Sequence, residues 1–113
     1  MKNFRLSEFT CKCGCGQSLM NKDFLERIDW ARDLAGVPFA ITSGYRCPDH
    51  NRKVGSTSTN HVRGVAADIV CTVGPNRLKI VKALLDTGFR RLGIHRQFIH
   101  ADVNEGPESI WFY

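Results

Sequence analysis

Residues 60–71 have the sequence NHVRGVAADIVC, in which a polar loop leads into an apolar segment. The part from residue 65 onward is rich in β-branched and apolar residues, which is typical of a central strand. Asp68 interrupts this strand, and a buried carboxylate is costly unless it is paired or binds a metal ion. His61 lies seven residues earlier, and Gly64 permits a close turn between the two. The stretch therefore predicts a strand that carries part of a site.

Helical and strand-like patterns alternate on both sides of this strand. Apolar spacing predicts a helix over residues 22–35, with Asn21 as its N-cap and Gly36 as its stop. A second helix is expected over residues 75–86, with its buried face formed by Leu78, Val81, Leu84 and Leu85. Further strands are expected at residues 39–41, 91–95, 98–103 and 110–113, and a long polar loop at residues 45–60. This order predicts an α+β fold with a small antiparallel sheet and flanking helices.

The composition is that of an ordinary globular domain. At about 150 residues per domain, a chain of 113 residues predicts one domain, residues 1–113. The chain is 42% hydrophobic and 24% charged, which excludes a disordered protein. Its 16 Lys and Arg residues against 11 Asp and Glu give a net charge of +5 that is spread along the chain. Positive charge that is spread in this way favours binding to polyanions in general. Because basic and aromatic residues do not alternate along a stripe, we expect no nucleic-acid partner.

A second segment, FIHAD at residues 98–102, adds a histidine to the expected site. His100 lies on the same strand face as Phe98 and Asp102, because side chains on a strand alternate. With His61 and Asp68 it would make two imidazoles and one carboxylate, the three-ligand set of a catalytic zinc site with a fourth position for water. The spacing alone leaves two other interpretations open, a hydrogen-bonded core histidine and a carboxylate in a salt bridge.

Three motifs together resemble a known family of zinc peptidases. They are SGYRCPDHN at residues 43–51, HVRGVAAD at residues 61–68 and FIHAD at residues 98–102. The family comprises D-alanyl-D-alanine carboxypeptidases and L-alanyl-D-glutamate endopeptidases, and it shares a fold with the hedgehog signalling domain. The resemblance extends from Phe9 to Tyr113 and is strongest to short members from phages and prophages.

The resemblance implies a role for several residues. His61, Asp68 and His100 match the positions of the ligands of one zinc ion. Arg46 matches the family's arginine that holds a substrate carboxylate or carbonyl, a role that suits its planar fork of donors. The structural alternative for Arg46 is a loop-to-sheet contact. Thr59 matches a hydroxyl residue that supports substrate binding.

The motifs leave two candidates for the residue that moves the proton. Related endopeptidases have a glutamate three residues before the last histidine ligand, where this chain has Gln97, which cannot act as a base. The carboxypeptidase branch has a histidine five residues before that ligand, and His95 occupies this position. We therefore expect His95 to be the acid/base or oxyanion-stabilising residue. Asp102 is the alternative base, unless it orients His100 or forms a salt bridge.

The resemblance implies a zinc-dependent peptidase that cuts peptidoglycan stem peptides, as a carboxypeptidase or an endolysin-type endopeptidase. The alternative is a catalytically inactive, zinc-containing module that binds the cell wall. Gln97, in place of a glutamate, is consistent with this alternative. No secretory signal or apolar span of about 20 residues is present, so we expect cytoplasmic synthesis and no membrane partner. We expect a monomer. We expect it to reach the cell wall through a phage holin or on a virion.

The five cysteines form no even disulfide set. Cys11, Cys13 and Cys15 have C-x-C-x-C spacing, whereas structural zinc sites prefer C-x2-C pairs. We therefore expect free thiols. A second, structural metal ion with Cys47, Cys71 or His50 as fourth ligand, and a disulfide, are the two alternatives.

Overall fold

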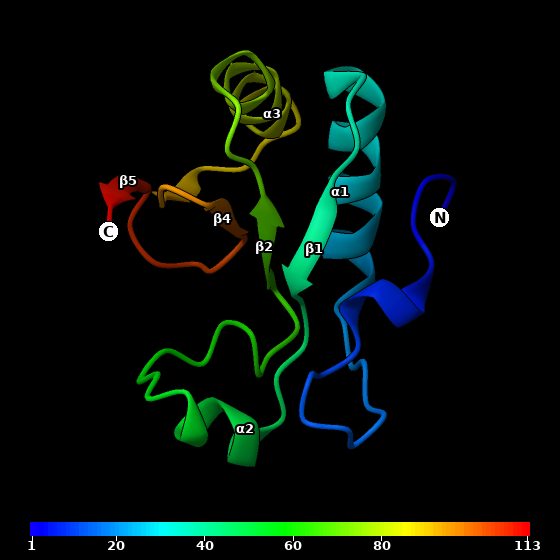
Figure 1. Ribbon diagram of the computed structural model, residues 1–113, viewed down its shortest axis with the longest axis vertical. Coiled ribbons are helices and arrows are strands. Elements are labelled where there is room, and N and C mark those ends of the chain that lie inside the picture. The colour runs from blue at the N-terminus through cyan, green and yellow to red at the C-terminus, as the bar shows by residue number, and fades with distance from the viewer.

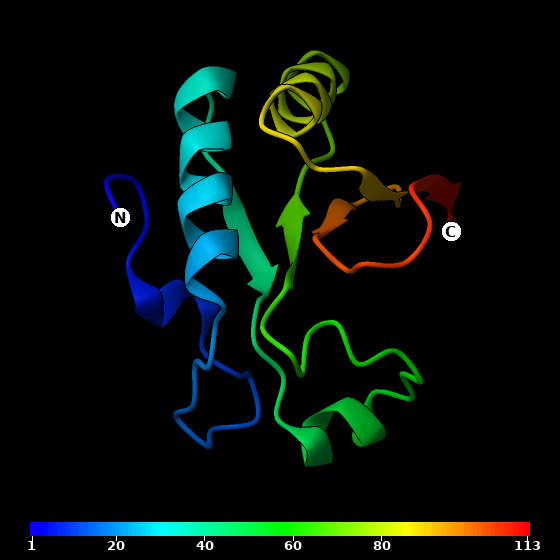
Figure 2. The ribbon, with the colours of Figure 1, turned by 180° about the vertical axis from the view of Figure 1, so that it is seen from behind.

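The computed structural model describes residues 1–113 and has an α+β architecture (Figure 1). In chain order its elements are the 3-10 turn η1 (Leu6–Phe9), α1 (Lys22–Ala35), β1 (Ala40–Ser43), α2 (Pro48–Lys53), β2 (Ala66–Val70), α3 (Gly74–Asp86), β3 (Arg91–Ile94), β4 (Phe98–Asp102) and β5 (Ser109–Phe112). The strands form one sheet in the order β1-β2-β4-β3-β5. The N-terminal segment lies beside α1, and β5 lies at the opposite side of the molecule (Figure 2). None of the helices has the length and apolar run that a membrane span requires.

The sheet is mixed, which differs from the antiparallel sheet that the sequence predicts. The pairs β1/β2, β2/β4 and β3/β4 are antiparallel, but β5 pairs in parallel with β3. Both edges of β4 are already occupied by β2 and β3, so the following strand cannot form a hairpin with it. β5 runs in the opposite direction to β4 and binds the free edge of β3, which makes the β3/β5 pair parallel.

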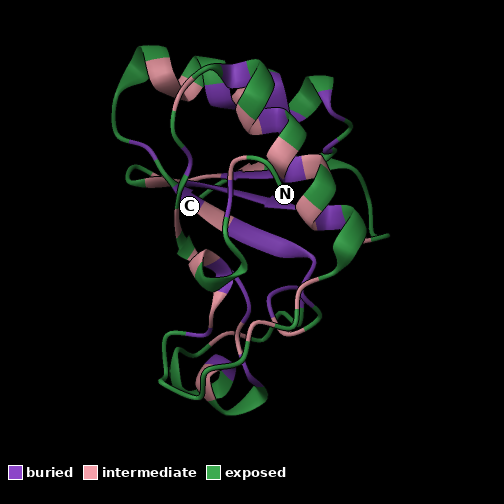
Figure 3. Ribbon diagram, turned by 90° about the vertical axis from the view of Figure 1, so that its right-hand side faces the viewer, coloured by how far each residue is buried: buried purple, intermediate pink, exposed green.

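One face of the sheet carries the core and the other carries polar groups. α1 and α3 cover the first face, where strand residues such as Ile69 and Ile99 are fully buried (Figure 3). Because side chains alternate along a strand, Asp68 on β2 and His100 on β4 point to the opposite face. The two residues are direct partners in the antiparallel register. The helices therefore stabilise the sheet from behind and leave the polar face for a site.

The sequence predicts α1 more accurately than α3. α1 has the predicted ends, since the Asn21 side chain accepts a hydrogen bond from the Phe24 amide and Gly36 has φ 68°. For α3 half of the predicted buried face is wrong. Leu84 is buried and Val81 is partly buried against the core, but Leu78 and Leu85 are exposed, and Ile80 and Ala83 are buried in their place. The buried face of α3 is set by the elements it packs against, which the apolar spacing alone does not specify.

The long connection from β1 to β2 is anchored by a close approach at Gly64. Gly64 has φ 71°, and its carbonyl accepts a hydrogen bond from the Asn21 amide at 2.9 Å. A Cβ at this position would lie 2.2 Å from the carbonyl oxygen of Leu19. The backbone of the N-terminal segment therefore presses directly on the loop that carries His61.

This close approach predicts that Gly64→Ala destabilises the protein more than Gly55→Ala. Gly55 also has positive φ, at 78°, but a Cβ there meets nothing within 4 Å. The control should therefore cost about 1–2 kcal/mol for the left-handed backbone alone. Gly64→Ala should cost about 2 kcal/mol more, because backbone atoms must move apart. Urea unfolding measures both, and equal losses of unfolding free energy would show that the contact does not constrain the loop.

Candidate metal centre

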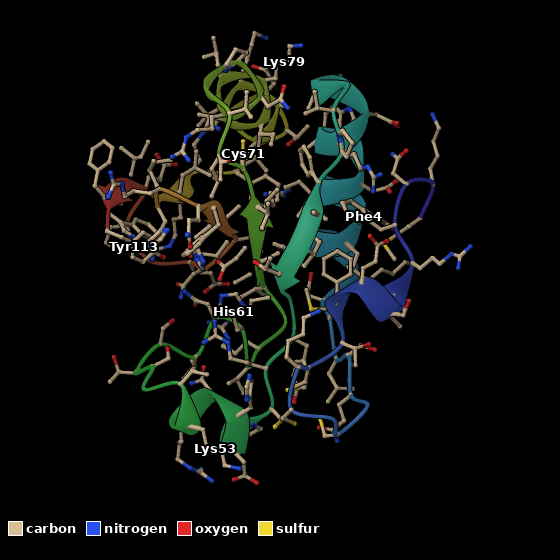
Figure 4. All side chains as sticks on the ribbon, in the orientation of Figure 1. Phe4, Lys53, His61, Cys71, Lys79 and Tyr113 are labelled. Carbon is tan, nitrogen blue, oxygen red and sulfur yellow. The ribbon has the colours of Figure 1, made fainter.

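The three predicted ligands lie together on the polar face of the sheet. The donor atoms of His61, Asp68 and His100 all lie within 4.8 Å of one another. Asp68 Oδ1 is 2.9 Å from His100 Nδ1 and 3.6 Å from His61 Nε2. Figure 4 shows His61 near the start of β2, between the sheet and α2. A loop and two paired strands thus bring one donor each to a common point.

The orientation of both imidazole rings is set by an oxygen on the far side of the ring. His61 Nδ1 lies 2.8 Å from the carbonyl oxygen of Gly44, which can only accept, so Nδ1 carries the proton and Nε2 is free to bind a metal. His100 Nε2 lies 2.8 Å from Asp102 Oδ2. A hydrogen bond donated there leaves Nδ1 facing Asp68. Two nitrogens and one oxygen directed at one point, each imidazole supported from behind, fit a catalytic zinc ion.

Asp102 lies behind His100 and is fully buried. Its Oδ2 also accepts from the Asn60 amide at 3.3 Å, and its Oδ1 accepts from Arg91 Nε at 2.7 Å and from the Asn104 backbone at 3.1 Å. Every donor around this carboxylate is therefore supplied by the protein. This is the arrangement of a positioning residue that orients His100, and it includes the arginine salt bridge that the sequence left open.

The electrostatics of the three donors follow from these contacts. Burial alone would raise the pKa of Asp68, but hydrogen bonds from His100 and His61 hold that pKa well below its usual range. Burial likewise would lower the pKa of His100, yet Asp102 and Asp68 on its two sides raise it to about 9. The lowered pKa keeps Asp68 in the carboxylate form, which is the form that binds a metal ion.

A cavity of about 420 Å³ opens onto this centre. Besides the three donors, its lining includes Arg46, Ser58, Phe98, Trp111 and Tyr113. The lining thus combines polar groups with three aromatic rings.

Arg46 is held in the cavity wall by neutral partners. Its Nε and Nη2 donate to Ser43 Oγ, each at 3.3 Å, and its Nη1 donates to Asn51 Oδ1 at 3.0 Å. Its backbone amide donates to the His61 carbonyl at 3.2 Å, which ties it to the metal centre. No carboxylate of the protein pairs with this guanidinium. One N–H on each terminal nitrogen is left to bind an anionic or carbonyl oxygen in the cavity.

Three predicted residues are not in the cavity lining, namely Thr59, His95 and Asp102, which lies behind His100. Thr59 is exposed, and only its backbone carbonyl makes a contact, to the Arg63 amide. His95 lies in the turn between β3 and β4, where its ring stacks on Phe98 with 4.4 Å between centroids. It also lies 5.5 Å from the Tyr113 ring, which does line the cavity. The functional roles of Thr59 and His95 therefore stay predictions.

Phe98, Trp111 and Tyr113 form an aromatic wall of the cavity, which the ligand motifs did not predict. Trp111 on β5 lies over His100, with 5.6 Å between ring centroids. Gly93 permits this, since a Cβ there would lie 2.6 Å from Trp111 Nε1. The alternation of side chains from β5 to the last residue places Trp111 and Tyr113 on one face, and the sequence alone shows this alternation. The sequence does not show the parallel register that pairs Gly93 with Trp111.

The chain matches a known protein family over most of its length. A family model described as Peptidase M15 matches residues 2–102, a range that includes His61, Asp68, His100 and Arg46. Trp111 and Tyr113 lie beyond the matched range. No curated protein shows significant similarity to the chain.

The contacts of Asp102 predict that Asp102→Asn weakens metal binding without removing a ligand. An asparagine side chain has one acceptor oxygen and no negative charge, so it cannot accept hydrogen bonds from both His100 and Arg91. His100 therefore loses the carboxylate that orients its ring. Zinc affinity, measured by competition with a chelator, should fall about 10- to 100-fold. Asp86→Asn, at an exposed carboxylate paired with Lys82, is the matched control and should leave affinity unchanged. An Asp102→Asn protein that folds and binds zinc as tightly as the wild type would contradict the positioning role.

Proposed function

The chain belongs to the peptidase M15 family of zinc-dependent peptidases, and we propose that it hydrolyses the stem peptides of bacterial peptidoglycan. The observation that carries the proposal is one cavity that joins His61, Asp68 and His100 to a guanidinium without a carboxylate partner. Zinc held by these three residues would activate water as a nucleophile near neutral pH and polarise the scissile carbonyl. Side chains of this protein would bind the substrate and stabilise the transition state.

Arg46 supports a substrate with a free carboxylate. Stem peptides contain D-residues that expose free α-carboxylates, and an arginine fork binds a carboxylate with two parallel hydrogen bonds. Ser43 and Asn51 fix the plane of the guanidinium, so little side-chain freedom is lost on binding. The net charge of +5 also favours the anionic polymers of the cell wall. The aromatic wall of Phe98, Trp111 and Tyr113 offers apolar surface for the rest of the peptide.

His95 is best suited to stabilise negative charge on the reacting carbonyl oxygen. Its Nδ1 accepts a hydrogen bond from the Gln97 amide at 3.0 Å, so the neutral ring carries its proton on Nε2 and acts as a donor. Tyr113 lies beside it, and burial raises the pKa of the Tyr113 phenol, which is therefore also a protonated donor at neutral pH. Tyr113 lines the cavity and His95 lies 5.5 Å from its ring, so we assign both donors to the carbonyl oxygen of a bound peptide.

The direct test is digestion of purified peptidoglycan, with the fragments identified by mass spectrometry. We expect cleavage that a chelator abolishes and added zinc restores, with a new terminus at a bond next to a D-residue. The fragments also distinguish a carboxypeptidase from an endopeptidase. Protein that holds zinc and binds peptidoglycan without cutting it would contradict the proposal and favour the inactive wall-binding module.

The contacts of Arg46 predict that Arg46→Lys lowers kcat/KM on a carboxylate-bearing stem peptide. Lysine keeps the charge but loses the fork, and the lost charged hydrogen bond corresponds to about 10- to 100-fold. An amidated peptide should lose the same factor with the wild type and lose little more with Arg46→Lys. Arg52→Lys, at an exposed arginine paired with Asp49, is the control. Equal amidation penalties in both proteins would show that Arg46 does not bind the carboxylate.

The position of His95 predicts that His95→Ala lowers kcat about 10²- to 10³-fold while KM changes little, because an oxyanion donor acts only in the transition state. His50→Ala, at a histidine outside the cavity, is the control. Steady-state kinetics on a defined stem peptide measure the split. A rise in KM with kcat unchanged would assign His95 to substrate binding, and wild-type kinetics would remove it from the site.

A further inference from the structure

Four of the five cysteines form a cluster separate from the histidine centre. Cys11, Cys13 and Cys15 lie in the N-terminal loop, and Cys47 is the N-cap of α2. Their Sγ atoms all lie within 4.8 Å of one another. Yellow sulfur atoms are visible in Figure 4 where the N-terminal loop meets the start of α2. The sequence left three residues open as a fourth member of this group, and the structure selects Cys47.

The sulfur separations match a shared ion better than a disulfide. Cys13 Sγ is 3.5 Å from Cys11 Sγ and 3.6 Å from Cys47 Sγ. A disulfide requires about 2.05 Å between sulfurs. Four thiolates at about 2.3 Å from a tetrahedral zinc ion lie about 3.8 Å from one another. Cys11, Cys13 and Cys47 are therefore already spaced as ligands of one ion.

The backbone around the cluster is shaped to present these sulfurs. Gly14 and Gly16 have φ of 92° and 75°, which turns the loop so that alternate cysteines reach the same point. The Cys47 amide donates to Cys11 Sγ at 3.3 Å, and the His50 amide donates to Cys47 Sγ at 3.4 Å. Such N–H donors stabilise thiolates, the form in which cysteine binds metals. Cys13 and Cys15 are exposed, so an ion has access to the cluster.

We propose that Cys11, Cys13, Cys15 and Cys47 bind a structural zinc ion as a closed four-thiolate site. Four protein ligands leave no position for substrate, which is the property of a structural rather than a catalytic site. Thiolate sulfur selects soft ions such as zinc over magnesium or calcium. Binding displaces the thiol protons into solvent and requires no oxidant. The ion links two segments that lie 32 or more residues apart in the chain.

The position of the site gives it a role in the catalytic cavity. Residues 44–47 run directly from the histidine centre to the cysteine cluster. The Gly44 carbonyl orients His61, the Tyr45 amide donates to the Phe9 carbonyl at 2.8 Å, and Arg46 lines the cavity. Tyr45 packs against Cys11 and Cys47 in a small buried cluster. An ion on Cys47 therefore fixes the segment that positions Arg46.

The test is cobalt substitution of the full chain under reducing conditions, because thiolate ligands give cobalt an intense charge-transfer absorption that imidazole and carboxylate ligands do not. We expect two metal ions per wild-type chain, and this absorption. Cys13→Ser/Cys15→Ser should lose the absorption and one ion, and it removes only exposed thiols. Cys71→Ser, at a buried cysteine outside the cluster, is the matched control and should keep both. His61→Ala/His100→Ala should lose one ion but keep the absorption.

Three results would overturn the proposal. They are a wild-type chain without the charge-transfer band, thiols that react equally fast before and after metal addition, and a native mass reduced by disulfide formation. Thermal unfolding gives a second measurement that does not depend on activity. Chelation should lower the Tm of His61→Ala/His100→Ala, and it should not change the Tm once Cys13 and Cys15 are also replaced. Peptidoglycan left uncut by a chain that shows the absorption would count against the proposed function alone.

Discussion

The hydrogen bond between Asp68 and His100 depends on the register in which β2 pairs with β4. Direct pairing of these residues brings their side chains within 2.9 Å on the open face of the sheet. A slip of one residue would turn Asp68 into the core and destroy both the site and the packing against α1 and α3. The apolar residues Ile69 and Ile99, fully buried on the other face, therefore enforce the geometry of the metal centre.

The rest of the centre is added to this strand pair by a loop that is fixed at several points. His61 is oriented by the Gly44 carbonyl, and Gly64 holds the loop against the N-terminal segment. Cys47 anchors the same loop to the cysteine cluster. A rigid sheet thus supplies two donors, while a tethered loop supplies the third donor and Arg46. This arrangement fixes the distance between the three donors and the Arg46 guanidinium, and catalysis depends on such fixed distances.

Local patterns in the sequence predicted what depends on local chemistry. An aspartate inside an apolar strand and a histidine on an alternating strand predicted two polar side chains, which the structure brings together, and Asn21 and Gly36 predicted the ends of α1. Features set by tertiary packing were not predicted. The buried stripe of α3 depends on the helix it packs against, and the parallel pairing of β5 depends on which strand edge is free. The proximity of Cys47 to the N-terminal cysteines depends on the path of two loops, which spacing does not encode.

The zinc site proposed at His61, Asp68 and His100 can be located by anomalous diffraction at the zinc edge, from crystals of protein purified without chelator. We expect a peak bound by His61 Nε2, Asp68 Oδ1 and His100 Nδ1, with Asp102 still bonded to His100 Nε2. A peak bound through His100 Nε2, or no peak between the three residues in protein that cleaves peptidoglycan, would contradict it.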